Sequence, residues 1–412
     1  MYGSVIGPRL CVLCRGRGLC GLTYCPLIVR SMTYLRLAPL KSSNVIEGSS
    51  PPSVFVGRAG YPHVRAGPAA PPEVGDTSVF DLPEAWLGRS LEEILNYRLS
   101  MVLGLGSASV KRVDDRLVGE LRLLALSSKP VDVRIEFLKP PRPKLSLSEE
   151  LPPMGPRSPL ERLSVVGNPH VPGVVDRVYG DRDLRARDAI LKLYESGIPV
   201  SHIQRLLSVG ALGTGKFRRL VPTRWSITAV DSTIARSLVS KIKGYRVIDS
   251  VEVYVWRGYD NTIIAILYPR KWSFEWMEAW WPGSTWNPGS LEVVVEGDYE
   301  GYSGRADYPS IGGCYYASML ATVEHLEARK RQATAILMRE IYPGFNIPVG
   351  VWFVREAARA MFRKGPLLKT GDMGEVGEVV ERESRLGWGV WLSRSKLLRR
   401  VVGERGLDFT FK

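Results

Sequence analysis

Four cysteines lie within fifteen residues near the start of the chain and form its densest group of potential metal ligands: Cys11, Cys14, Cys20 and Cys25. Four thiolates complete the tetrahedral shell of Zn2+ and leave no open position, as in structural zinc sites. An iron–sulfur cluster is the main alternative, because it uses the same four donors. The spacing therefore predicts a structural zinc centre. Arg15 and Arg17 lie between the ligands, where they contact phosphate or offset the negative charge of the centre, and both interpretations stay open.

A second group of reactive side chains lies in the second half of the sequence. Glu275 and Glu278 are followed by Asp298, Glu300 and Arg305. Carboxylates gathered near an arginine bind a divalent metal or supply acid–base groups. They also form ordinary ion pairs with the many arginines of the chain. We predict a candidate catalytic site here, and a divalent metal if the protein is an enzyme.

Cys314 follows two glycines at the expected start of a helix. A helix N-terminus lowers the pKa of a thiol and can activate it as a nucleophile. No histidine is near it in the sequence, so a small buried residue between packed helices is the favoured interpretation.

A basic segment follows a glycine-rich stretch near the middle of the chain. Residues 210–216 match the first part of a phosphate-binding loop, but Phe217 stands where Ser or Thr must hold Mg2+. The sequence therefore does not predict an ATPase. The cations around this stretch, which we expect to contact DNA phosphates, are Lys216, Arg218, Arg219 and Arg224.

The chain of 412 residues carries a formal net charge of +14. An excess of this size favours a polyanionic partner, first nucleic acid and second an anionic membrane surface. No run of about 18 apolar residues is present, so no membrane span is expected. The local cysteine cluster suits a reducing cytosol. We expect a cytoplasmic, nucleoid-associated protein.

The elements that must position these residues are predicted from hydrophobic periodicity. Strands are expected at 53–56, 117–125, 131–137 and 291–295, with a strand pair at 251–256 and 262–268. Helices are expected at 91–102, 181–196, 199–209, 232–241, 273–280, 313–342 and 351–362. Trp272, Trp276 and Trp280 would share one face of the helix at 273–280 and favour a core position.

We predict an α+β protein with a zinc-knuckle N-terminus, a mixed α/β main domain and a mainly helical C-terminal domain. The domain boundaries follow changes in composition. The expected parts are a four-cysteine segment (1–40), a large mixed domain (41–295), a smaller helical domain (296–403) and a tail (404–412).

These motifs together resemble the archaeal Nre family of DNA-repair proteins, of the NreA type. The resemblance spans nearly the whole chain. The segments that carry it are the cysteine knuckle, 51–62, Gly67-Pro68, 220–228 with Asp231, Trp272-Ser-Phe-Glu275 with Glu278-Ala-Trp280, Asp298-Tyr-Glu300, Arg331-Gln332-Ala333 followed by Arg339-Glu340-Ile341, and 348–356.

The resemblance implies a role in DNA-damage repair and a C-terminal peptide that binds the sliding clamp. In this chain the peptide would comprise Glu404, Leu407, Phe409 and Phe411 in an extended tail, with Glu404 in place of the usual Gln and alternating aromatics. We therefore expect a DNA-binding repair factor recruited by the clamp. The alternative is a phosphodiesterase or nucleotidyl hydrolase acting on DNA ends or nucleotide adducts, which would require the carboxylates, Arg224 and Arg305 to converge on one cleft.

Overall fold

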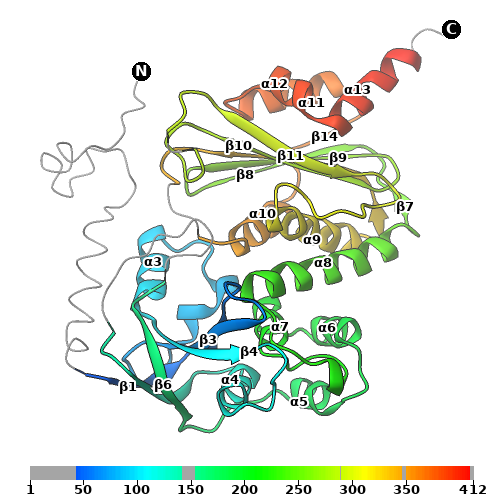
Figure 1. Ribbon diagram of the computed structural model, residues 1–412. Coiled ribbons are helices and arrows are strands. Elements are labelled where there is room, and N and C mark those ends of the chain that lie inside the picture. Colours follow the sequence, from blue (N-terminus) through cyan, green and yellow to red (C-terminus); the bar gives the residue numbers. More distant parts are fainter. Residues whose placement is uncertain (1–42, 142–153, 288, 346–348, 409–412) are drawn as a thin grey trace, which may run out of the picture. The chain divides into compact units, whose positions relative to one another are not determined.

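The computed structural model describes residues 43–141, 154–287, 289–345 and 349–408. These residues divide into two compact units (Figure 1). The N-terminal unit ends at Ile234, and the C-terminal unit begins at Ala235. The boundary falls inside helix α8 (Thr223–Ile242).

The N-terminal unit contains a six-stranded sheet in the order β1-β5-β6-β4-β3-β2, in which only β4 and β6 run parallel. Its strands are β1 (Val45–Ser50), β2 (Ser53–Val56), β3 (His63–Ala70), β4 (Val102–Ser109), β5 (Val131–Phe137) and β6 (Arg157–Val165). In β5 valine, isoleucine and phenylalanine alternate with polar residues, and the apolar positions are the buried ones. This alternation is the period that one half-covered face of a sheet requires.

Two helices of this unit begin at residues whose side chains accept hydrogen bonds from their first N–H groups. Ser90 and Glu93 form a reciprocal capping box at the start of α3, and the Asp115 carboxylate accepts a hydrogen bond from Leu117 N at the start of α4. The helices are α3 (Leu91–Ser100), α4 (Arg116–Leu126), α5 (Gly173–Gly180), α6 (Ala186–Glu195) and α7 (Val200–Ser208), with short 3-10 turns η2 (Ser78–Asp81), η3 (Pro83–Ala85) and η4 (Gly215–Phe217).

The C-terminal unit contains a second six-stranded sheet in the order β11-β10-β13-β9-β8-β14. Strands β10 and β13 are parallel and the other neighbours are antiparallel. The strands are β8 (Val251–Gly258), β9 (Asn261–Tyr268), β10 (Ser273–Trp280), β11 (Val294–Glu300), β13 (Thr334–Ile341) and β14 (Leu368–Thr370), and a separate two-stranded sheet pairs β7 (Arg246–Val247) with β12 (Arg331–Gln332).

The predicted strand pair at 251–256 and 262–268 is confirmed as the hairpin of β8 and β9. Tyr259 and Asp260 both have φ of 52°, which is the geometry of a two-residue type I′ turn. This turn matches the right-handed twist of the strands and fixes their register.

Helices cover both faces of this sheet (Figure 1). On one face lie α9 (Gly313–Ala328) and α10 (Trp352–Lys364). On the other face lie α11 (Met373–Glu383), α12 (Trp388–Arg394) and α13 (Lys396–Asp408), whose apolar residues join the sheet in one buried cluster. With both faces covered, the central strands are buried along their whole length, as in β9 and β13.

The prediction of a helix at 273–280 is wrong, because this segment is strand β10. Trp272, Trp276 and Trp280 are four residues apart. A spacing of four fits one face of a helix and one face of a strand equally well. The strand forms because β11 and β13 pair with it on both sides.

The prediction of one helix from 313 to 342 is also wrong. Helix α9 ends at Ala328, and Lys330 with φ of 52° turns the chain into β12 and β13. A strand that is buried on both faces has no polar alternation, so it could not be separated from the preceding helix by periodicity.

The predicted strand at 117–125 is helix α4. Its buried residues include Val118, Leu121 and Leu124, which are three apart and so follow a helical stripe. Helices predicted at 91–102, 181–196, 199–209 and 351–362 are confirmed as α3, α6, α7 and α10, and α8 extends the one predicted at 232–241. The α+β class is therefore correct. The residues from 296 onward contribute strands as well as helices, and the expected boundary at 295 falls inside β11.

Candidate functional site

The two glutamates of β10 point to opposite faces of the sheet, because they are three residues apart in a strand. The Glu275 carboxylate accepts hydrogen bonds from the Ser395 hydroxyl, from Lys396 N at 2.8 Å and from Leu397 N at 2.9 Å. Burial raises the pKa of Glu275, although these hydrogen bonds act in the other direction. Glu275 therefore satisfies the first N–H groups of α13 and anchors that helix to the sheet.

Glu278 lies on the α9 face and pairs with Arg339 of β13 at 3.0 Å. The Arg339 Nε donates to Asn261 Oδ1 at 2.8 Å, and its guanidinium lies over the rings of Trp280, Phe345 and Phe353. Burial raises the pKa of Glu278, and the Arg339 charge and hydrogen bond oppose that rise. The two side chains are 3% and 4% exposed, so they form a buried ion pair.

Cys314 lies beside this ion pair at the start of α9. Burial, and then the Glu278 charge, raise the pKa of its thiol far above the ordinary value. The thiol therefore stays protonated at neutral pH, and a nucleophilic role is not supported. The sequence favoured a small buried residue between packed helices, whereas Cys314 is partly buried and its thiol faces Glu278 of strand β10.

Asp298 and Glu300 of β11 pair in register with Trp276 and Phe274, so they lie on the same face as Glu278. Asp298 forms an ion pair with Arg305 at 2.8 Å and accepts from Ser310 N at 2.9 Å. Burial tends to raise the pKa of Asp298, but these bonds lower it overall. Burial raises the pKa of Glu300, which accepts from Trp272 Nε1 at 3.4 Å and Tyr315 OH at 3.3 Å.

Each of the four carboxylates thus has its own structural partner. Across the described ranges, no group of three or more His, Cys, Asp or Glu side chains is arranged to hold a metal ion. Glu275 faces away from the other three carboxylates, and Arg224 belongs to the N-terminal unit. The sequence alternative, in which these carboxylates pair with arginines, holds for Glu278 and Asp298, whereas Glu275 accepts from the start of α13 and Glu300 accepts from two aromatic side chains.

The predicted basic edge divides into inward and outward side chains. Arg218 points inward, where its Nε donates to Gly213 O at 2.8 Å and its Nη2 donates to Tyr179 O at 2.8 Å and Asp181 O at 3.0 Å. Burial and the neighbouring arginines lower its pKa. Its role in the structure is to tie the 213–218 loop to the end of α5.

The glycines of this stretch also have a structural reason. Gly210 has φ of 69°, and a Cβ there would lie 2.7 Å from the Arg219 carbonyl oxygen. The stretch follows helix α7 and not a strand, which agrees with the rejection of an ATPase loop from the sequence.

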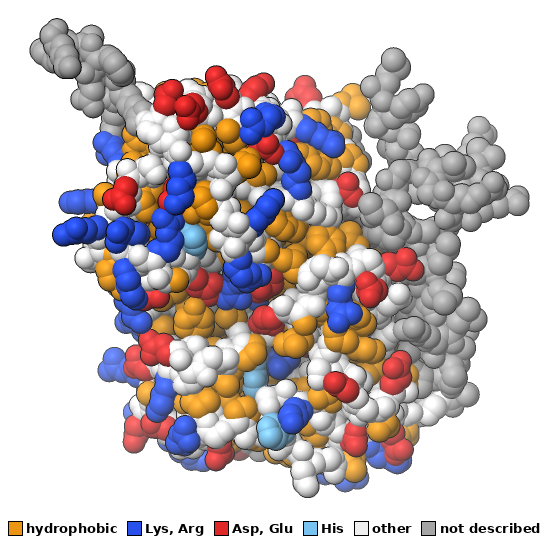
Figure 2. Space-filling view, turned by 180° about the vertical axis from the view of Figure 1, so that it is seen from behind, with side chains coloured by type: hydrophobic (Ala, Val, Ile, Leu, Met, Phe, Trp, Pro, Cys, Tyr) orange, Lys and Arg blue, Asp and Glu red, His pale blue; other side chains and the backbone are white. Residues whose placement is uncertain are grey.

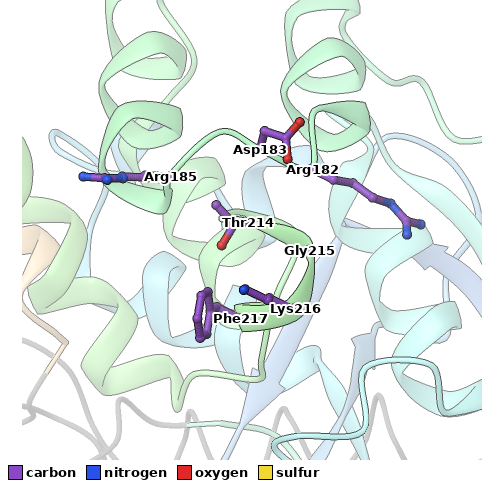
Figure 3. Close-up of a pocket in the computed structure, with 7 residues that line it drawn as sticks. All are labelled: Arg182, Asp183, Arg185, Thr214, Gly215, Lys216 and Phe217. Atoms are coloured by element: carbon purple, nitrogen blue, oxygen red, sulfur yellow. The ribbon is translucent and has the colours of Figure 1, made fainter.

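Lys216 and Phe217 line an open cavity of about 760 Å3, together with Thr214, Gly215, Arg182, Asp183 and Arg185 (Figure 3). Figure 3 shows Lys216 and Phe217 side by side, while Arg182 and Arg185 extend to opposite sides of their turn. Phe217 is 61% exposed, and the Lys216 ammonium lies 5.2 Å from its ring centre. Gly215 N donates to Arg182 O at 2.7 Å and joins the two walls.

A pair of exposed aromatic rings lies in the same unit at the start of α8. Tyr61 and Trp225 are 5.3 Å apart between ring centres, and each is about 45% exposed. Val56 N donates to Thr223 Oγ1 at 2.9 Å, which holds the end of β2 against this helix start. Cations and exposed aromatics together are the residues that single-stranded nucleic acid contacts.

Sequence analysis missed Tyr61, Phe217, Trp225 and the two arginines of the cavity. The available signal was that each of the three aromatic residues is next to Gly, Pro, Lys or Arg in the sequence. Some predicted site residues lie outside the described residues: the predicted zinc ligands Cys11, Cys14, Cys20 and Cys25, the neighbouring Arg15 and Arg17, and the tail residues Phe409 and Phe411.

The family model described as "Archaeal Nre, N-terminal" matches residues 19–287, and the one described as "Archaeal Nre, C-terminal" matches residues 300–409. The chain belongs to the archaeal Nre family. The family predicted from the sequence is therefore confirmed.

Three curated relatives of this chain are named as DNA repair proteins. It is 46% identical to "DNA repair protein NreB" of Archaeoglobus fulgidus over 95% of this chain and 97% of the relative. It is 34% identical to "DNA repair protein NreA" of the same organism, over 95% and 98%. It is 38% identical to "DNA repair protein NreA" of Haloferax volcanii, over 76% and 77%. The comparison with solved structures found no match.

The two Nre family models meet between residues 287 and 300, whereas the compact C-terminal unit begins at Ala235. One sheet contains strands from both sides of that interval. Among the described helices, none has the length and apolar character needed to cross a membrane. Helix α13 continues to Asp408, so residues 404–408, including Glu404 and Leu407, are helical and not extended as predicted.

Proposed function

We propose that this chain is a DNA-repair protein that binds DNA through the exposed cations and aromatic rings of its N-terminal unit. The names of the Nre relatives support the repair role. The observation that supports DNA binding is the cavity beside Lys216 and Phe217, which combines three cationic side chains with one exposed ring. The excess positive charge of +14 supports the same proposal.

The structure refines which residues we propose as DNA contacts. Lys216 and Arg219 are exposed, and Arg224 lies in the first turn of the helix that carries Trp225. Arg218 is removed from the set because its guanidinium bonds three backbone carbonyls. Arg182 and Arg185 are added because they line the cavity on both sides.

The test is a salt titration of DNA affinity with the double variant Lys216→Gln/Arg219→Gln. We expect weaker binding and a shallower salt dependence, because fewer counterions are released. The matched control is Arg157→Gln/Arg162→Gln on β6, which removes the same charge from exposed positions of the same unit. Equal affinity of the two double variants would place the contacts elsewhere, and a wild-type chain that does not bind DNA at low salt would refute the proposal.

A stacking role for Phe217 is tested separately with Phe217→Leu. Loss of a stacked base costs on the order of 1–3 kcal/mol, and the loss should be confined to single-stranded ligands. Equal losses on single-stranded and duplex DNA would contradict stacking.

We also propose that Cys11, Cys14, Cys20 and Cys25 hold one structural zinc per chain, with Arg15 and Arg17 beside it. The support is the ligand spacing alone. Metal analysis of the pure protein is expected to give one zinc, and Cys14→Ser is expected to lose it. A coloured iron–sulfur chromophore would contradict the proposal.

Recruitment by the sliding clamp through the end of the chain is the last part of the proposal. The apolar residues Leu407, Phe409 and Phe411 support it, because large apolar anchors carry most of the energy of such contacts. A peptide of residues 401–412 is expected to bind the clamp, and Phe411→Ala to weaken it by about 2 kcal/mol. No heat of binding at high micromolar clamp would retire this part.

A further inference from the structure

The C-terminal unit carries a group of cations that the sequence analysis did not single out. We name it the β7 patch, and it consists of Lys243, Arg246, Lys271, Lys330 and Arg331 with the ring of Tyr302. These residues come from six segments: the end of α8, strand β7, the β9–β10 turn, the loop after β11, the α9–β12 turn and strand β12. The β7 segment lies at the right of Figure 1, which becomes the left of Figure 2, where Lys and Arg side chains gather.

Two contacts bring the lysines of the β7 patch onto one aromatic ring. The Lys243 ammonium lies 4.7 Å from the centre of the Tyr302 ring, and the Lys271 ammonium lies 5.8 Å from it. Tyr302 is 45% exposed and Lys271 is exposed, whereas Lys243 is half-buried and its Nζ donates to Tyr302 O at 2.5 Å. Each cation gains attraction from the ring, but the two ammonium groups repel each other.

The arginines of the β7 patch are also held together. Arg246 and Arg331 are directly opposite each other in the β7–β12 pair. The two strands run parallel, and two like charges on neighbouring strands repel each other. Lys330 adds a third positive charge beside them, with Glu327 as its carboxylate partner. The fold therefore bears an electrostatic cost here that a bound polyanion would relieve.

A buried amide holds this surface in a fixed shape. Gln332 is only 6% exposed, and its Nε2 donates to Lys243 O at 3.1 Å and to Tyr245 O at 2.6 Å. Its Oε1 accepts from Trp272 N at 3.1 Å. One side chain thus joins the end of α8, β12 and the start of β10, so the cations are presented by a rigid frame and not by a loose loop.

We propose that the β7 patch is a second DNA-binding surface, which contacts backbone phosphates through its lysines and arginines. The inference rests on the proposed function, because it takes DNA as the polyanion. Phosphate contacts fix position and add affinity without reading sequence, and point charges around an aromatic ring suit them. An anionic membrane is the competing partner, and the test includes it.

The experiment compares the full-length chain with the triple variant Arg246→Gln/Lys271→Gln/Lys330→Gln. The control triple, Arg363→Gln/Lys364→Gln/Arg394→Gln, removes the same charge from exposed positions of the same unit. Duplex DNA affinity is measured from low to moderate salt. We expect the patch triple to bind at least tenfold more weakly at moderate salt and to lower the salt slope by about 2 to 3, because each neutralised phosphate contributes about one to that slope.

The outcomes separate the inference from the function on which it rests. If the wild type binds DNA and the two triples behave alike, the patch proposal is overturned while DNA binding stands. If the wild type does not bind DNA at all, the proposed function fails. If the patch triple keeps DNA affinity but loses binding to phosphatidylserine vesicles, the patch serves a membrane and the inference is overturned. Thermal unfolding of both triples checks that each variant is folded.

Discussion

The carboxylates on the C-terminal sheet and the cations on the surfaces of the two units are all charged side chains, but their environments are opposite. Glu275 and Glu278 are buried, and each has partners with good geometry. Lys216, Arg246 and Lys271 are exposed. A buried charge contributes to stability through its partner, whereas an exposed charge contributes little to stability and is available to a ligand. The residue type therefore predicts that a side chain is charged, and burial determines whether that charge stabilises the fold or is available to a ligand.

The largest expected effect of this comparison is at the buried ion pair. Glu278→Ala leaves the Arg339 guanidinium buried without its carboxylate, which costs about 3–5 kcal/mol. Chemical denaturation of the variant and the wild type measures the difference. A double variant, Glu278→Leu/Arg339→Met, removes both charges and is expected to recover much of the loss. A Glu278→Ala variant of full stability but altered activity would show that the carboxylate has a catalytic use.

The next effect is at the helix start that Glu275 satisfies. Glu275→Ala leaves the Ser395 hydroxyl, the buried Leu397 N–H and the partly buried Lys396 N–H without their acceptor, and we expect a loss of about 2–3 kcal/mol. Hydrogen exchange should show faster opening of α13 than of β10. Equal protection of α13 in both proteins would contradict an anchoring role for Glu275.

A smaller effect is the pH dependence of stability that comes from the buried carboxylate of Glu252. Burial tends to raise the pKa of Glu252, but the hydrogen bonds from Arg329 and Tyr254 lower it to about 2. Because the pKa is lower in the folded state, this stabilisation is complete above the unfolded value near 4.5 and is lost as the pH falls toward 2. In Glu252→Gln the acid loss of stability between about pH 5 and 2 should be smaller than in the wild type. Parallel curves would show that the Glu252–Arg329 pair does not drive it.

The smallest expected effect is the change in the stability of the protein when exposed cations are removed. Lys216→Gln/Arg219→Gln should change the free energy of unfolding by less than about 0.5 kcal/mol, since surface substitutions away from packed features rarely exceed this. Thermal and chemical unfolding measure it, together with DNA affinity. A loss above about 1 kcal/mol would place these side chains among the structural residues, and the contrast with Glu278 would disappear.

The same contrast appears within the basic segment of the N-terminal unit. Arg218 and Arg219 are adjacent in the sequence, yet Arg218 bonds three carbonyls and Arg219 is exposed. Nothing in the sequence separates them, because two of the carbonyls that receive Arg218 come from residues 179 and 181, almost forty positions away.

The sequence by itself determined what short-range chemistry controls. It determined the β8–β9 hairpin, whose two-residue turn is local, and the helices α6, α7 and α10, whose stripes repeat within a few turns. It also determined the positive charge and the family, because the Nre motifs are distributed along the chain.

Only the tertiary structure decided features that depend on distant partners. Strand β10 forms because β13, about sixty residues later, pairs beside it in parallel. Glu278 became a buried ion pair because Arg339 lies opposite it in that same register. The β7 patch exists because β12 brings Arg331 beside Arg246. Periodicity in one segment records which residues share a face, but it contains no information about which segment will cover that face, and that covering determines whether a charge is buried or free to bind.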